Sequence, residues 1–269
     1  GYLRVTREFR AEVGADASAY QPQYIRDFVL TQAQQHSRAK ASQAVSALRN
    51  YLRFYIASGE CRAGLDDAVP RIANWRLSTL PRYMEPEAVE RTISEVDTAT
   101  EAGLRDRAVL LLLARLALRA GEVADLRLAD LDFDEGRVAV AGKTRQEHWL
   151  PLPQDVGEAI LQYLTRRSFK GGDAVFLTLT VPYRPVASHV VTQIARRAIR
   201  SAGVISPSLG AHVFRHSAAT GVLRKGVPVS SIGAVLRHES LESVAHYAKV
   251  DLKLLSSIAR PWPVEGLPC

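Results

Sequence analysis

Three short stretches, far apart in the chain, contain side chains that could act together on a phosphodiester. In chain order they form an Arg-x-x-Glu pair, a His-x-x-Arg pair, and a His followed nine residues later by a Tyr: Arg119 and Glu122, His212 and Arg215, His238 and Tyr247. Arginine carries a permanent charge and can hold a phosphate through two parallel hydrogen bonds. These residue types therefore favour cleavage of a phosphodiester without a metal ion.

Each of these groups has a chemical reason to be present. Cleavage requires that the charge on the non-bridging oxygens be neutralised as the pentacoordinate transition state forms, and Arg119 and Arg215 could do this. Tyr247 is the candidate nucleophile. Because a free phenol has a pKa of about 10, it needs a nearby base or positive charge before it can attack. His212 and His238 could transfer protons or donate hydrogen bonds to the phosphate.

Each residue alone also has an ordinary structural explanation. Arg119 could be an ion-paired residue at a helix end, and Tyr247 could be a core aromatic. His212 and His216 are spaced as i and i+4 and could be metal ligands. Zinc would need a third ligand and a glutamate between the two histidines, whereas Val-Phe-Arg lies there. We therefore expect no metal ion and no cofactor, and the joint occurrence of all the groups favours the catalytic interpretation.

The order and spacing of these residues resemble those of the tyrosine recombinase, or phage integrase, family over residues 80–250. The pattern of that family is Leu-Arg-x-x-Glu, a Lys in a β-hairpin, His-x-x-Arg, a later His or Trp, and finally Tyr. The resemblance implies a site-specific recombinase that cuts and rejoins double-stranded DNA through a 3′-phosphotyrosine and a Holliday junction, without ATP. The catalytic residues that it implies are Arg119, Lys143, His212, Arg215, His238 and Tyr247.

The resemblance also implies roles for neighbouring residues. Lys143, in the turn Gly142-Lys143-Thr144-Arg145, would give a proton to the leaving 5′-oxygen, and Glu122 would position its neighbours. The turn lacks the second glycine and the second lysine that are common in the family, so Arg145 is a rival for the role of Lys143. Three further departures, none of which removes a reactive group, are Ala211, Phe214 and Arg237.

The elements that must position these groups follow from the pattern of apolar residues. Residues 22–59 carry apolar side chains at helical spacing, and Pro86 opens a further helix. A buried helix follows from Arg105. Two β-rich runs, 137–141 and 148–152, flank a turn, which indicates a hairpin. We therefore predict a mainly α fold with one small antiparallel β-sheet.

Three parts are predicted along the chain. The proline-bracketed stretch 69–81 is typical of a linker, so we expect residues 1–79 to form a helical domain and residues 80–255 to form the catalytic domain. By resemblance to the family, the first domain clamps DNA against the second. Residues 256–269 then form a tail that docks on a neighbouring protomer.

The composition indicates a polyanionic partner. The 269 residues include 35 Lys and Arg against 28 Asp and Glu, a net charge of +7, and 29 of the basic residues are Arg. Arginine is the basic residue better suited to holding phosphates. The cluster Arg196, Arg197 and Arg200 is predicted to form either a solvated or a DNA-facing edge of a helix.

The sequence also bears on the location of the protein. No apolar run reaches the roughly 18 residues of a membrane span. The chain begins Gly-Tyr-Leu-Arg, without an initiator Met or a signal-peptide pattern, so an upstream domain could have been removed. Cys61 and Cys269 are the only cysteines, too few for a disulfide framework, and we expect a cytoplasmic protein that acts on DNA.

Three other interpretations are kept as alternatives. A type IB topoisomerase uses a similar residue set but relaxes DNA as a monomer. A non-enzymatic DNA-binding regulator could retain the fold, and an unrelated helical protein could carry the motif by chance. For a recombinase we expect a homotetramer, with or without accessory recombination proteins. The sequence leaves open the target site and the choice among integration, excision, transposition and resolution of chromosome dimers.

Overall fold

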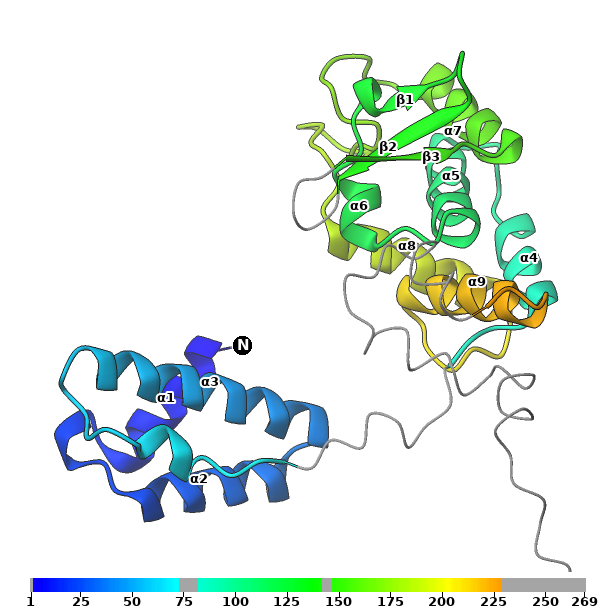
Figure 1. Cartoon of the computed structure of the whole chain (residues 1–269). Helices are drawn as coiled ribbons and strands as arrows, with labels where there is room; N and C mark the ends of the chain where they lie inside the picture. Colours follow the sequence, from blue (N-terminus) through cyan, green and yellow to red (C-terminus); the bar gives the residue numbers. More distant parts are fainter. Residues whose placement is uncertain (1, 73–81, 142–146, 229–269) are drawn as a thin grey trace, which may run out of the picture. The chain divides into compact units, whose positions relative to one another are not determined.

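The chain divides into two compact units. The computed structural model describes residues 2–72, 82–141 and 147–228. Contacts divide the chain into the units Gly1–Arg76 and Leu77–Cys269 (Figure 1). Each unit has a hydrophobic core of its own.

The first unit is helical. Its helices are α1 (Tyr2–Val13), α2 (Pro22–Gln35) and α3 (Arg38–Ala57), with single 3₁₀ turns at Ala17–Ala19 and Leu65–Ala68. Pro22 opens α2 in the first turn, where its missing N–H costs nothing. Gly59 follows the end of α3 with a φ of 77°, a left-handed conformation that is common after a helix and that glycine adopts without strain. The helices predicted within residues 22–59 are confirmed, and α1 is an additional helix.

Aromatic side chains form the centre of the first unit. Phe9 from α1 meets Tyr20 and Phe28 edge to face, with ring centroids 5.1 and 5.2 Å apart. Leu48 and Leu52 of α3 are fully buried in the same cluster. Such edge-to-face pairs add to the stabilisation from buried area. The unit is therefore held by a core that joins all three helices.

The second unit is helical with one small sheet. Its helices are α4 (Pro86–Ser94), α5 (Glu101–Arg115), α6 (Ala120–Ala124), α7 (Gln154–Arg166), α8 (Ser188–Ser201) and α9 (His212–Arg224). Its strands are β1 (Leu131–Asp132), β2 (Arg137–Ala141) and β3 (Glu147–Pro151), paired antiparallel in the order β1-β2-β3. The predicted fold class is confirmed. The hairpin strands lie within one residue of the predicted runs, and β1 is an additional short strand.

Helix α5 lies at the centre of the second unit and contacts α4, α6, α7, α8 and α9 (Figure 1). Thr100 caps its first turn by accepting a 3.0 Å hydrogen bond from the backbone N–H of Gly103. The side chains of residues 110–113 are at most 1% exposed, because helices cover α5 on several sides. This explains why its apolar pattern is continuous instead of one-sided.

Within residues 2–72, 82–141 and 147–228, no helix is both long enough and apolar enough to cross a membrane.

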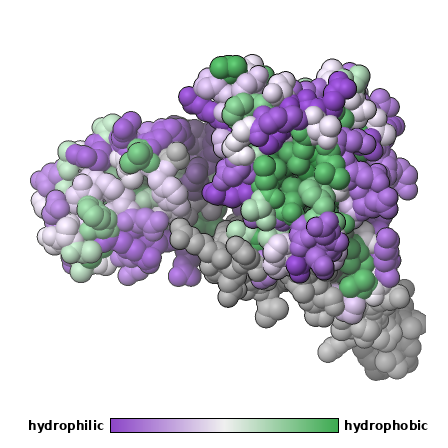
Figure 2. All heavy atoms as spheres, turned by 90° about the horizontal axis from the view of Figure 1, so that it is seen from above, coloured by the Kyte–Doolittle hydropathy of each residue, from purple (hydrophilic) through white to green (hydrophobic). Residues whose placement is uncertain are grey.

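Some apolar surface stays on the outside of the second unit. Figure 2 shows hydrophobic residues gathered on the face seen from above, bordered by hydrophilic ones. Trp149 on β3 is 47% exposed, and the guanidinium of Arg137 on β2 lies 4.6 Å from its ring centroid. A cation over an indole face is attracted by the ring quadrupole. The basic side chain therefore covers part of an exposed aromatic ring on the sheet.

We predict that α5 dominates the stability of the second unit. Leu111→Ala should lower the free energy of unfolding by about 2–5 kcal/mol, because a leucine that is 1% exposed leaves a cavity. Leu161→Ala on α7 is the matched control: this leucine is 46% exposed, and its loss should change stability by about 0.5 kcal/mol or less. Urea unfolding followed by circular dichroism measures both, and equal losses would contradict the central role of α5.

Candidate active site

Arg119 is held in place by a buried carboxylate. It is the N-cap residue of α6, four positions after α5 ends at Arg115. One carboxylate oxygen of Glu122 accepts a 2.6 Å hydrogen bond from the Arg119 guanidinium, and the other accepts a 2.9 Å bond from its backbone N–H. Glu122 is 8% exposed and Arg119 is 36% exposed. The pair therefore fixes the guanidinium while leaving part of it accessible.

Arg215 reaches the same region from the other end of the sequence. It lies in the first turn of α9 and is 1% exposed. Its guanidinium donates a hydrogen bond to the backbone carbonyl of Ala117, two residues before Arg119. This contact joins the segment after α5 to α9, so the two arginine-bearing stretches meet as the sequence predicts.

Ala117 has an unusual backbone conformation at this junction. Its φ is 51°, the left-handed region that L-residues other than glycine rarely adopt. Its methyl group is buried in a small cluster with Ala219 and Leu223 of α9. No local motif in the sequence singles out Ala117. Only its place between a buried helix and a candidate catalytic arginine could have drawn attention to it.

His212 is the first residue of α9 and lies beside both arginines. Partial burial of its ring lowers the pKa of His212, and the positive charges of Arg215 and Arg119 lower it further. The ring meets that of His216 edge to face, with centroids 4.4 Å apart. At neutral pH the lowered pKa keeps His212 uncharged, a state in which it can accept a proton.

The structure thus brings together four of the residues predicted from the sequence: Arg119, Glu122, His212 and Arg215. Lys143 and Arg145 belong to the segment 142–146, and His238 and Tyr247 belong to the segment 229–269. Both segments lie outside the described residues. Strand β2 ends at Ala141 and β3 begins at Glu147, so Lys143 lies in the connection between two paired strands.

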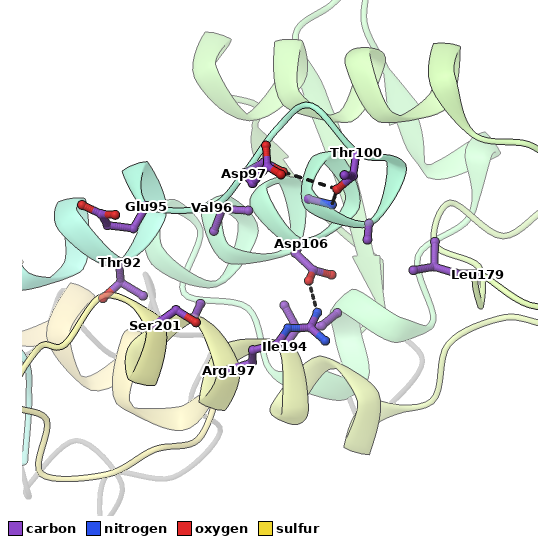
Figure 3. Close-up of a pocket in the computed structure, with 13 residues that line it drawn as sticks. Thr92, Glu95, Val96, Asp97, Thr100, Asp106, Leu179, Ile194, Arg197 and Ser201 are labelled. Carbon is purple, nitrogen blue, oxygen red and sulfur yellow. Dashed lines mark hydrogen bonds and ion pairs between the residues drawn. The ribbon is translucent and has the colours of Figure 1, made fainter.

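The three arginines of α8 differ in their surroundings. Arg196, Arg197 and Arg200 are all exposed. Arg197 forms an ion pair with Asp106 of α5, whose other oxygen accepts a 2.9 Å hydrogen bond from Arg105. Figure 3 shows Arg197 reaching from α8 toward Asp106 at a cavity of about 320 Å³. Arg197 is therefore engaged with another helix of the protein, a partner that the sequence analysis did not consider.

The sequence shows only the Asp106 side of that contact. Arg105 and Asp106 are adjacent charges in the first half of α5, and each side chain is less than one-tenth exposed. Buried charges require partners, and Arg105 is one partner of Asp106. A second basic partner of Asp106 comes from another helix. No local spacing indicates that this residue is Arg197, 91 positions away.

Comparison with known proteins identifies relatives along most of the chain. The model of the phage integrase family matches residues 82–253. The putative integrase/recombinase y4rA of Sinorhizobium fredii is 41% identical over 244 residues, which cover 90% of this chain and 59% of that protein. The tyrosine recombinase XerA of Thermococcus kodakarensis is 30% identical over 226 residues, 82% of this chain and 74% of that protein. The chain spans 59% and 53% of the length of two S. fredii relatives, y4rA and y4rF.

Solved structures share the fold. The XerH site-specific recombinase bound to palindromic difH substrate, in a post-cleavage complex, has a TM-score of 0.76 at 19% identity, covering 95% of this chain and 76% of that one. A lambda integrase dimer bound to a COC′ core site has a TM-score of 0.70 at 17% identity, covering 99% and 91%. The family match includes Arg119, the His212–Arg215 motif and Tyr247. By this match and by the identity to its relatives, the chain belongs to the phage integrase family of tyrosine recombinases.

Proposed function

We propose that this protein is a site-specific DNA recombinase that cleaves and rejoins DNA through a 3′-phosphotyrosine intermediate and a Holliday junction, without a metal ion or ATP. The observation that supports it most is the meeting of Arg215 with the chain two residues before Arg119, beside His212. The guanidinium groups of Arg119 and Arg215 are permanently charged and held in position, as binding of a single phosphate requires. The relatives are named as integrases and recombinases, which favours recombination over the relaxation of a topoisomerase.

In this mechanism the arginines stabilise the charge that develops on the non-bridging oxygens. Glu122 holds Arg119, and the Ala117 carbonyl holds Arg215, so neither guanidinium has to reorganise during the reaction. Tyr247 attacks the phosphorus. A bond from its phenol oxygen to phosphorus forms as the bond to the 5′-oxygen breaks. The reverse attack by a 5′-hydroxyl restores the phosphodiester and frees the tyrosine.

Two proton transfers accompany each cleavage. Tyr247 loses its phenolic proton. We assign its acceptance to His212, which is uncharged because of its lowered pKa, or else a hydrogen bond from His212 to the phosphate. The leaving 5′-oxygen gains a proton, which we assign to Lys143, with Arg145 as the rival. His238 completes the set as a hydrogen-bond donor to the phosphate.

Double-stranded DNA is the proposed partner, and a homotetramer the proposed assembly. The net charge of +7 suits a polyanion. A solved lambda integrase structure is a tetramer bound to a Holliday junction. We assign residues 1–79 to clamping the duplex, residues 80–255 to catalysis and residues 256–269 to docking on a neighbour. Of the α8 arginines, Arg196 and Arg200 are better placed for phosphate contacts, since Arg197 pairs with Asp106.

We predict that Tyr247 forms the covalent link. On nicked duplexes that carry a candidate site, the wild-type protein should accumulate a DNA adduct, and Tyr247→Phe should abolish it, because phenylalanine has no nucleophilic oxygen. Tyr24→Phe, in an exposed tyrosine of the first unit, is the control. Mass spectrometry of the adduct peptide identifies the residue, and a link to any other side chain contradicts the assignment.

We predict that Arg215 acts on phosphate charge. Arg215→Lys should slow single-turnover cleavage by about 100- to 1,000-fold, the loss expected for one directed donor at a developing charge. The loss should shrink when the scissile phosphate is replaced by an uncharged methylphosphonate. A folding defect would reduce cleavage of both substrates alike, and that result would overturn the role. Arg127→Lys, at an exposed ion pair with Asp173, serves as the control.

We predict that His212 titrates below the ordinary histidine value of about 6.5. Burial and two positive neighbours disfavour its charged form, so the ring should stay neutral until the pH falls below that value. NMR titration of the ring protons, assigned with His212→Asn, measures this. Arg119→Gln removes one neighbouring charge and should move the midpoint upward. A midpoint at or above the ordinary value, unchanged in the variant, would disprove the electrostatic contact.

A further inference from the structure

The segment through which the chain enters the second unit contacts α9. Residues 82–85, the lead-in segment, directly follow the residues that connect the two units and directly precede α4. Met84 of this segment is 2% exposed in the core. Its backbone N–H donates a 2.8 Å hydrogen bond to the hydroxyl of Ser217 on α9, and that hydroxyl donates a 2.9 Å bond to the carbonyl of Val213. One serine thus connects the lead-in segment to the backbone of α9.

A second connection lies at the far end of the helix. Arg224, the last residue of α9, donates a 2.6 Å hydrogen bond to Glu85 and a further bond to the hydroxyl of Tyr83. Its guanidinium also lies over the Tyr83 ring, 4.8 Å from the centroid. An ion pair combined with a cation–π contact fixes the direction of an arginine better than either alone. The lead-in segment therefore holds α9 at two points seven residues apart.

Contacts with other elements fix the position of α9. In the described part of the chain no side chain caps the helix at Ala211, so these contacts matter for its first turn. On one side it meets Ala117, through the Arg215 hydrogen bond and the cluster with Ala219. Val213 and Phe214 of α9 are buried in the main core, and the lead-in segment supplies a further set of contacts. The same helix presents His212 and Arg215.

We propose that Ser217 and Arg224 are positioning residues: through the lead-in segment they hold α9 where His212 and Arg215 reach the scissile phosphate. This inference rests on the proposed function. Neither residue touches the reacting atoms. Because residues 82–85 follow the connection between the units, the segment also joins that connection to the helix of the active site.

A charge exchange tests the inference. The Glu85–Arg224 pair is exposed, with side chains 55% and 48% accessible, so breaking it should barely change stability. Glu85→Arg and Arg224→Glu should each slow single-turnover cleavage by about 10- to 100-fold, since a displacement of about 1 Å at a reacting group can cost roughly that much. The double variant restores the opposite charges and should recover most of the rate. Saturating protein removes differences in DNA affinity from the measurement.

Matched variants separate positioning from general effects of charge. Asp173→Arg and Arg127→Glu alter a more exposed ion pair of the second unit and should leave the cleavage rate within about twofold. Ser217→Ala should slow cleavage, while Ser217→Thr, which keeps the hydroxyl, should not. On a methylphosphonate substrate the losses should be smaller, because misplacing Arg215 matters less where no charge is neutralised.

The outcomes are distinct. Single variants that cleave at the wild-type rate, or a double variant no faster than either single variant, would overturn the positioning role. Equal losses on the charged and uncharged substrates would overturn it as well. If the wild-type protein itself forms no covalent adduct on any nicked substrate, the proposed recombinase function fails, independently of the lead-in segment.

Discussion

A buried guanidinium beside a backbone carbonyl organises the second unit. Arg215 is 1% exposed, and removing so much of a charged group from water is costly unless hydrogen bonds offset the loss. The carbonyl of Ala117 is one acceptor, and Ala117 itself adopts a left-handed backbone conformation. In the proposed reaction on a phosphate, the burial of this charge would strengthen its effect. A desolvated charge interacts with an anion more strongly than one that remains in water.

Helix α5, which precedes Ala117, is also held firmly by its neighbours. Arg115, the last residue of α5, donates hydrogen bonds of 2.6 Å to Glu90 of α4 and 2.9 Å to Asp155 of α7. The buried leucines of α5 hold the same helix from inside. The end of α5 is therefore tied to two neighbouring helices just before the chain turns toward Ala117 and Arg119. Rigid support of this kind is what a preorganised electrostatic site requires.

Local patterns in the sequence were sufficient to predict many of the elements that position the site. The apolar run of α5, the hairpin strands and the helical His-x-x-Arg stretch have periodicities that are visible in the sequence itself. The conformation of Ala117 was not predictable in that way, since alanine gives no hint of a positive φ. Nor were the pairings of Arg197 with Asp106 and of Arg224 with Glu85, which span 91 and 139 positions. Contacts between residues so far apart depend on how the helices pack against one another, and residue spacing does not predict that packing.

The start of α9 has one more consequence for substrate binding. A helix N-terminus exposes backbone N–H groups and a partial positive charge, which a capping side chain usually satisfies. Ala211 has no side-chain oxygen to offer. In the proposed reaction, a phosphate docked beside His212 would accept hydrogen bonds from N–H groups of this first turn. The substrate would then take the place of the side-chain cap that Ala211 cannot provide.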